Sequence, residues 1–389
     1  MSPSSEPGAP GRPGWEPLRN GSLVRGDALL HHVIQEHAMH LPSILLASLC
    51  TLAGCASHAP GTAVDVEVDR LMARYAGDGP GASLLVVQDG VEVIRRGYGF
   101  ADLEEGVEAG PSTHYRLASV SKQFTAAAVL LLANDGKLNL DDPARAWLPS
   151  LPSAARDITL RHLLTHTSGL IDYEDVMPEM DEGAQLRDAD VLRILASQDR
   201  LYFAPGTSYR YSNSGYALLA LVVERASGRS FPDFLRERIF EPLGMEAVAY
   251  VRGGPEPMHR AYGYSEVDGR WERTDQSSTS AVLGDGGIYA SIDDLAKWDA
   301  ALYDDRLLDD ASRRLAFAAA TPTDQPHVAY GYGWRITGDT LWHSGETIGF
   351  RNVIVRWPEQ RLTVAILSNR NDPEPYETAL AIGTLFGAK

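Results

Sequence analysis

Residues 115–132 read YRLASVSKQFTAAAVLLL, an apolar stretch with a small, polar beginning, which predicts a long helix from Ser119 to Asn134. The pair Asp135-Gly136 that follows is typical of a helix end. Ser119 and Lys122 are three residues apart, so the serine hydroxyl and the lysine amine share one helix face. A desolvated lysine can accept the serine proton and so make the hydroxyl a nucleophile. A serine at a helix start is also a common cap, so this tetrapeptide alone leaves both interpretations open.

Apolar runs joined by short turns flank this helix and predict β-hairpins. The first hairpin is SLLVVQ-Asp89-Gly90-VEVIRR, in which the Asp-Gly pair supplies the turn. Two more follow near the C-terminus, at 330–343 around Gly338-Asp339 and at 351–368 around Pro358. Helix patterns occur at 63–75, 159–165, 189–197, 214–226, 231–240, 292–303 (after a Ser291/Asp294 capping box) and 374–386. The order of elements predicts an α/β fold that is interrupted by an all-helical part.

Two further motifs contain residue types that suit acyl transfer. Tyr211-Ser212-Asn213 opens the helix at 214–226, where a tyrosine can pass a proton and an asparagine amide can orient a substrate carbonyl or fix the lysine. His343-Ser344-Gly345 is expected at the end of a strand at 340–343, where glycine lets a ligand backbone approach. The N–H of Glu346 would then join the N–H of Ser119 in an oxyanion hole. Taken singly, each motif is explained as well by a helix cap, a core tyrosine or a strand-end turn.

The order and wide spacing of the three motifs, with the second inside the helical part, resemble the penicillin-recognising serine hydrolases. That family includes class C β-lactamases, D-alanyl-D-alanine carboxypeptidases, D-aminopeptidases and related esterases. The strings LLTHTSGL at 163–170, GDGGIYASIDDLAKW at 284–298 and YGYGW at 330–334 are also similar to family strings. The resemblance runs from about residue 65 to the end. It implies a β-lactamase/transpeptidase-like fold, with an antiparallel sheet flanked by helices and an inserted all-helical domain. His166 in the first string is expected to shape the site without direct chemistry.

The resemblance implies an acyl-enzyme on Ser119, with Lys122 and Tyr211 sharing the general-base role and with no metal or organic cofactor. Ester, amide or D-amino-acid peptide substrates are expected. Family members that act on β-lactams commonly have lysine where this chain has His343, and a neutral histidine is a weaker partner for a substrate carboxylate. Weak β-lactamase activity is therefore expected. The alternative is a catalytically silent protein that binds cell-wall peptides or penicillin, which the intact Ser119, Lys122 and Tyr211 disfavour.

The charge and the cysteine content argue against several kinds of partner and bound group. The chain has 35 Lys and Arg against 52 Asp and Glu, a formal net charge of −17. This balance argues against nucleic acid as a partner, because no basic surface is available to displace phosphate counterions. Two cysteines, Cys50 and Cys55, are too few for a disulfide framework or a thiolate zinc cluster. The histidines show no spacing typical of metal ligands. The sequence leaves the oligomeric state open.

The segment before Cys55 carries a different signal. Residues 41–54, LPSILLASLCTLAG, form an apolar run too short to span a bilayer as a helix. With Cys55 the run resembles the lipobox of bacterial lipoprotein signal peptides, which implies lipidation of Cys55, membrane attachment and a periplasmic or cell-envelope location. A true start at Met39 would place this segment at the N-terminus. A buried apolar helix with an incidental cysteine is the alternative.

These observations predict the domain organisation. Residues 1–60 are expected to hold a disordered extension and the signal segment, and residues 61–389 the hydrolase domain. Within the hydrolase domain we expect an α/β part at about 61–154 and 284–389 and a helical part at about 155–283.

Overall fold

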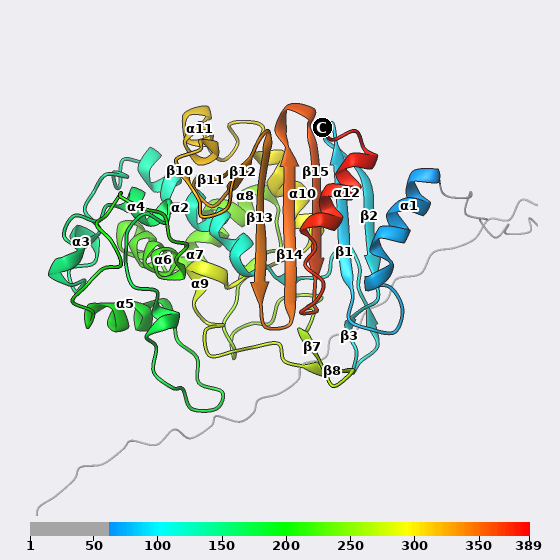
Figure 1. The fold of residues 1–389 in the computed structure, drawn as a ribbon, viewed down its shortest axis with the longest axis horizontal. Helices are drawn as coiled ribbons and strands as arrows, with labels where there is room; N and C mark the ends of the chain where they lie inside the picture. The colour runs from blue at the N-terminus through cyan, green and yellow to red at the C-terminus, as the bar shows by residue number, and fades with distance from the viewer. Residues whose placement is uncertain (1–61) are drawn as a thin grey trace, which may run out of the picture. The chain divides into compact units, whose positions relative to one another are not determined.

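The main sheet combines strands from both ends of the described chain. The structure is a computed structural model that describes residues 62–389, so the predictions for residues 1–60, Met39, Cys50 and Cys55 lie outside the described residues. The sheet has eight antiparallel strands in the order β10-β11-β12-β13-β14-β15-β1-β2, which places N-terminal β1 beside C-terminal β15 (Figure 1). The strands are β1 Ala82–Gln88, β2 Val91–Tyr98, β10 Thr321–Pro322, β11 Val328–Tyr330, β12 Arg335–Thr337, β13 Thr340–Thr347, β14 Phe350–Trp357 and β15 Leu362–Ser368.

Alternating side chains of the central strands fill two separate cores. Leu84 of β1 packs in a cluster with Ile382 of helix α12 (Tyr376–Leu385), and α1 (Ala63–Met72) covers the same face. The next residue, Leu85, belongs to the cluster on the opposite face, together with Leu295 of α10 (Ile292–Ala301). Successive strand residues point to opposite faces, so a continuous apolar strand indicates a sheet covered on both sides. The predicted antiparallel sheet flanked by helices is confirmed.

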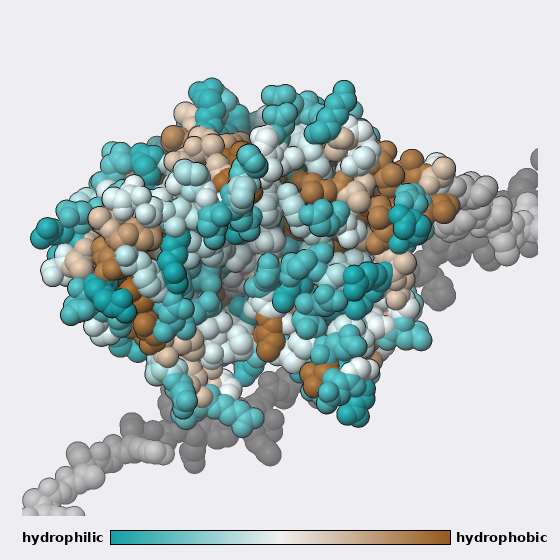
Figure 2. Space-filling view, viewed as in Figure 1, coloured by the Kyte–Doolittle hydropathy of each residue, from teal (hydrophilic) through white to brown (hydrophobic). Residues whose placement is uncertain are grey.

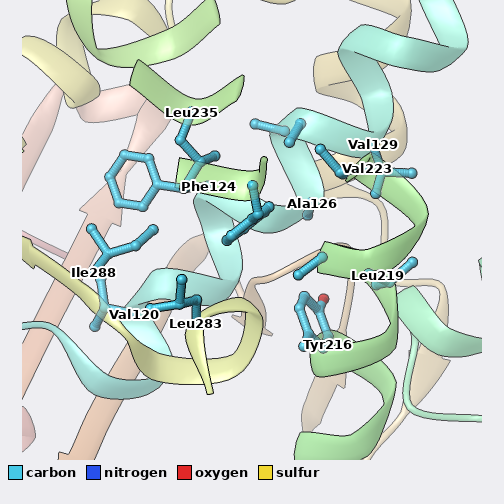
Figure 3. Packing of buried hydrophobic residues seen from close by; sticks show 14 of the residues in the cluster. Val120, Phe124, Ala126, Val129, Tyr216, Leu219, Val223, Leu235, Leu283 and Ile288 are labelled. Atoms are coloured by element: carbon cyan, nitrogen blue, oxygen red, sulfur yellow. The ribbon is translucent and has the colours of Figure 1, made fainter. Parts of the chain in front are cut away.

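Helix α2 (Lys122–Asn134) lies in the interior of the helical part. Its residues from Lys122 to Leu132 are buried, which is typical of a helix that is enclosed on all sides. Figure 3 shows Phe124, Ala126 and Val129 of α2 among side chains of three other elements: Leu219 and Val223 of α6 (Asn213–Ser227), Leu235 of α7 (Phe231–Leu235) and Ile288 of β9 (Ile288–Ala290). This packing fixes α2 and therefore the turn that precedes it. The other helices are α3 Ala144–Trp147, α4 Leu160–Leu164, α5 Asp188–Ala196, α6 Asn213–Ser227, α7 Phe231–Leu235, α8 Glu241–Leu243, α9 Leu283–Gly286 and α11 Asp310–Phe317.

Short 3-10 turns and small sheets complete the fold. The 3-10 turns are η1 Ala73–Tyr75, η2 Ala118–Ser121, η3 Ser153–Ala155, η4 Tyr173–Asp175 and η6 Pro358–Gln360, and η5 Arg236–Phe240 is a π turn between α7 and α8. The small sheets pair β3 (Phe100–Asp102) with β4 (Val107–Glu108), β9 (Ile288–Ala290) with β5 (Tyr115–Arg116) and β6 (Val248–Ala249), and β7 (Tyr264–Val267) with β8 (Arg270–Arg273). Strands β6, β7 and β8 lie within residues 155–283, for which the sequence analysis predicts a helical part. The boundary of that part at residue 283 stays a prediction.

Two predictions about element boundaries were wrong. The residues from Ser119 to Ser121 belong to the 3-10 turn η2 rather than to the first turn of the long helix, because the backbone hydrogen bonds here join residues three apart: the Val120 N–H donates to Leu117 and the Lys122 N–H to Ser119. The strand predicted at 340–343 continues to Thr347, because β14 pairs with it along its whole length from Leu341. His343-Ser344-Gly345 therefore lies inside a strand and not at its end.

The visible surface is mostly hydrophilic (Figure 2). Hydrophobic residues gather on this face around α1 and α12, and Val66 of α1 is 66% exposed. Within residues 62–389, no helix has the length and apolar character needed to cross a membrane.

Candidate active site

Lys122 holds the centre of the site through three hydrogen bonds. Its buried Nζ lies 3.0 Å from Ser119 Oγ, 2.8 Å from Asn213 Oδ1 at the start of α6, and 2.8 Å from the backbone oxygen of Asp285 in α9. These contacts join η2, α6 and α9, three segments that are far apart in the sequence. The structure thus brings together Ser119, Lys122 and Asn213, and it adds Asp285, which the sequence motifs did not reveal.

Close backbone packing places the Ser119 turn against the sheet. A Cβ added at Gly345 of β13 would lie 2.1 Å from the Leu117 carbonyl oxygen, so only glycine allows this approach. Ala118, which immediately precedes Ser119, has a left-handed φ of 49°, a conformation that is unfavourable for a residue with a Cβ. The position of Ser119 is therefore fixed by backbone contacts as well as by Lys122.

Tyr211 lies beside Lys122, and its hydroxyl forms no hydrogen bond with the described residues. Lys122 Nζ is 4.9 Å from the centroid of the Tyr211 ring, and the buried Tyr211 hydroxyl makes no hydrogen bond within residues 62–389. The ring of His166 packs 4.3 Å from the Tyr211 ring, and its Nδ1 accepts the Ser212 N–H at 3.1 Å. Burial, with Lys122 nearby, holds the pKa of His166 well below its usual value. His166 is therefore a neutral ring that supports Tyr211.

His343 is neutral, and both of its ring nitrogens take part in hydrogen bonds. Its Nδ1 lies 2.6 Å from the Ser344 carbonyl oxygen, which can only accept, so Nδ1 donates and Nε2 accepts from the Tyr330 hydroxyl at 3.0 Å. Burial, and next the positive charge of Arg335, hold the pKa of His343 well below its usual value. The imidazole offers a substrate neither a charge nor a free N–H. Its contacts instead tie β13 to Tyr330 of β11.

One pocket contains the nucleophile and several polar groups. Ser119, Asn213 and Glu346 line it, and so do Glu174 and Asp285, two acidic residues that the sequence analysis did not select. The full lining is Arg116, Ala118, Ser119, Tyr173, Glu174, Asn213, Thr279, Asp285, Gly286, Glu346 and Thr347. Ser344 and Gly345 precede Glu346 on β13, so the third motif reaches this pocket from the sheet side.

Burial raises the pKa values of two acidic residues in and beside the pocket. Burial raises the pKa of Asp285 to about 8, and the Tyr173 hydroxyl donates to its Oδ2 at 3.0 Å. Burial likewise raises the pKa of Asp188 to about 7. The Asp188 carboxylate accepts hydrogen bonds from the N–H groups of Leu283 and Gly284, both at 3.0 Å, and so holds the start of α9.

Within residues 62–389, no group of three or more His, Cys, Asp or Glu side chains is placed to hold a metal ion.

Comparisons with known proteins agree on one family. A family model described as Beta-lactamase matches residues 67–388. Penicillin-binding protein 4* of Bacillus subtilis (strain 168) is 33% identical over 327 residues, which cover 78% of this chain and 72% of that protein. A D-aminopeptidase of Gluconobacter oxydans (strain 621H) is 30% identical over 337 residues, covering 83% of this chain but only 62% of that longer protein.

A solved structure gives the same result. D-amino acid amidase from Ochrobactrum anthropi SV3, in complex with L-phenylalanine amide, matches with a TM-score of 0.73 at 25% identity, covering 84% of this chain and 100% of that chain. These similarities support a small-molecule or peptide substrate. Because the family model spans nearly all of the described residues, the chain belongs to the β-lactamase family and is a serine hydrolase.

Proposed function

We propose that this serine hydrolase cleaves ester, amide or D-amino-acid peptide bonds through an acyl-enzyme on Ser119. The observation on which the proposal rests is the 3.0 Å contact between Lys122 Nζ and Ser119 Oγ in a pocket lined by polar groups. A D-aminopeptidase and a D-amino acid amidase among the similar proteins support this substrate class. In the first step Ser119 Oγ bonds to the substrate carbonyl carbon, and the leaving amine or alcohol departs with a proton. Water then hydrolyses the acyl ester.

The contacts of Lys122 suit a proton acceptor. A neutral amine has two N–H groups, and Asn213 Oδ1 and the Asp285 carbonyl oxygen, both at 2.8 Å, can take one each. The remaining lone pair then points at the Ser119 hydroxyl. Tyr211, whose hydroxyl has no other partner among residues 62–389, would return the proton to the leaving group and activate water. The N–H groups of Ser119 and Glu346 would hold the oxyanion.

The state of His343 supports weak β-lactamase activity. A buried, neutral imidazole with both nitrogens engaged supplies no positive charge for a β-lactam carboxylate. We expect nitrocefin turnover to be well below turnover of p-nitrophenyl esters. Comparable rates for the two substrates would reverse this ranking.

Covalent labelling separates the proposal from the alternative of a silent cell-wall peptide or penicillin binder. We expect a fluorophosphonate probe to label the wild type, and Ser119→Ala to abolish the label. Ser112→Ala, at an exposed serine outside the pocket, is the matched control and should label normally. Absence of label at Ser119 in a protein that still binds cell-wall peptides would favour the binder. A panel of p-nitrophenyl esters, nitrocefin and D-Ala-D-Ala peptides then ranks the substrates.

A second proposal concerns the segment before the described residues. The lipobox-like sequence that ends at Cys55 supports lipidation there and attachment to the cell envelope, with Met39 as the start of translation. Metabolic palmitate labelling tests this: Cys55→Ala should lose the label, whereas the matched variant Cys50→Ala should keep it. Labelling that persists in Cys55→Ala would contradict the proposal.

A further inference from the structure

The amide of Asn213 has an acceptor and a donor, and the proposed reaction needs them in one order. Its Oδ1 accepts from Lys122 Nζ at 2.8 Å, and its Nδ2 donates to Glu174 Oε2 at 3.2 Å. Turning the amide over would exchange the two atoms with almost no change in shape. Nδ2 would then face Lys122, and its N–H could donate to the amine lone pair that Ser119 needs.

Lys122 does not set this order by itself. In the neutral form that takes the serine proton, the amine both donates and accepts, so it can pair with either end of the amide. The backbone of Asn213 does not set the order either. Its N–H donates to Asp172 Oδ2 at 2.7 Å, which places the main chain whichever way the side chain is turned. Within residues 62–389, the side chain of Asn213 has no hydrogen-bond partner besides Lys122 and Glu174.

Glu174 sets the order, because an ionised carboxylate can only accept hydrogen bonds. An Asn213 oxygen turned toward Glu174 Oε2 would bring two acceptors together with no proton between them. The carboxylate therefore holds Nδ2 on its own side of the amide and leaves Oδ1 for Lys122.

The fold keeps Glu174 at this distance from Asn213. Glu174 lies on η4, and the preceding Tyr173 donates its N–H to Ser214 Oγ at 2.8 Å, so η4 is tied to the start of α6. Glu174 Oε1 lies 3.5 Å from the Tyr173 hydroxyl. The side chain is exposed, lines the pocket that contains Ser119 and forms no ion pair with any described residue. No other charge therefore draws the carboxylate away from the amide.

We infer that Glu174 is a positioning residue that fixes the orientation of the Asn213 amide, so that Lys122 keeps its lone pair directed at Ser119. This role rests on the acyl-enzyme proposed above. Glu174 acts through Asn213 and Lys122 and needs no contact with the substrate. Its loss should therefore slow attack by Ser119 on every substrate, whether or not the substrate carries an ammonium group.

Reagents without an ammonium group provide the first test. Glu174→Met removes the acceptor at similar size and should lower the rate of Ser119 labelling by a fluorophosphonate, and kcat/KM for p-nitrophenyl acetate, about tenfold. Glu174→Asp, which can also only accept, should recover part of both rates. The matched control is Glu179→Met, at an exposed glutamate in a separate cavity, and it should keep wild-type rates. Urea denaturation checks that each variant is folded.

Removing Asn213 tests whether Glu174 acts through it. Asn213→Ala takes away one acceptor of Lys122 and should label slowly. Adding Glu174→Met to this variant should then cause no further loss, because no amide is left to orient. A further tenfold loss in the double variant would overturn the inference.

The pH dependence of labelling gives an independent readout. Burial, and next the charge of Asp172, raise the pKa of Glu174. A protonated carboxyl can donate and no longer fixes the amide, so the labelling rate should fall by up to about tenfold as pH falls through this raised pKa. Glu174→Met should lack this step. It keeps the other charged and titratable groups that face Glu174, which are Asp172, Tyr173, Lys122 on α2, Asp285 on α9, and Arg116 and Glu346 of the pocket lining.

A substrate with a free ammonium group separates this role from substrate binding. If Glu174→Met slows only D-alanine p-nitroanilide and leaves labelling and p-nitrophenyl acetate turnover unchanged, Glu174 binds the ammonium and the inference is overturned. If the wild type is labelled at Ser119 and Glu174→Met is labelled equally fast, the inference fails and the proposed function stands. If the wild type is not labelled at Ser119, the proposed function fails.

Discussion

Replacing Gly345 by alanine tests whether the contact between β13 and the Ser119 turn sets the reaction geometry. The new Cβ would lie 2.1 Å from the Leu117 carbonyl oxygen and 3.3 Å from Val120 Cγ2. Real Cβ atoms essentially never approach a heavy atom closer than 3.0 Å, so the strand or the turn must move by about 0.9 Å. The obstacle is backbone, and no side-chain rotation removes it. A displacement of about 1 Å at a reacting group can lower the rate by about 10²-fold.

We therefore expect Gly345→Ala to lower kcat for a p-nitrophenyl ester, and the rate of fluorophosphonate labelling, by about 10²-fold. Overpacking should also lower the free energy of unfolding by about 1–3 kcal/mol, measured by urea denaturation. The matched control is Gly110→Ala, where an added Cβ meets nothing within 4 Å. The control should retain wild-type rates and stability. A Gly345→Ala enzyme with wild-type kcat would refute the reasoning, whatever its stability.

Lys122→Met should lower the rate of Ser119 labelling by at least about 10²-fold, because the proton acceptor is lost, and circular dichroism checks that the variant is folded. Tyr330→Phe leaves the buried Nε2 of His343 without its donor and should lower the free energy of unfolding by about 1–3 kcal/mol in urea. The raised pKa values, about 8 for Asp285 and about 7 for Asp188, mean that the native state keeps protons that the unfolded chain releases above about pH 4. These groups should therefore lower the free energy of unfolding as pH rises from about 4 to 8, and a urea series should give a shallower slope for Asp285→Asn.

Elements whose signal is local were predictable from the sequence. The Asp89-Gly90 hairpin appears as predicted, with positive φ at both turn residues. The Ser291/Asp294 capping box forms at the start of α10. The three-residue spacing predicted the contact between Ser119 and Lys122, and the resemblance to a known family gave the fold. In each case the deciding residues are neighbours in sequence or belong to a recognisable motif.

The remaining features depend on contacts between distant segments. The close approach of Leu117 to Gly345 joins residues more than two hundred positions apart, so no local sequence pattern reveals it. The charge of His343 is decided by burial and by Tyr330 on another strand, neither of which the motif itself reveals. Glu174 belongs to no motif of the sequence analysis, and its place in the pocket beside Asn213 follows only from the fold.

The short pairing between β12 and β13 has an evolutionary consequence. The groups that would handle protons lie on η2, α2 and the start of α6, whereas β12 is a separate three-residue strand that pairs with β13 only along Thr340–Trp342. Substitutions or length changes in β12 can therefore occur while the Ser119–Lys122 contact stays intact. Descendants of such a chain could vary this strand through intermediates that keep the nucleophile in place.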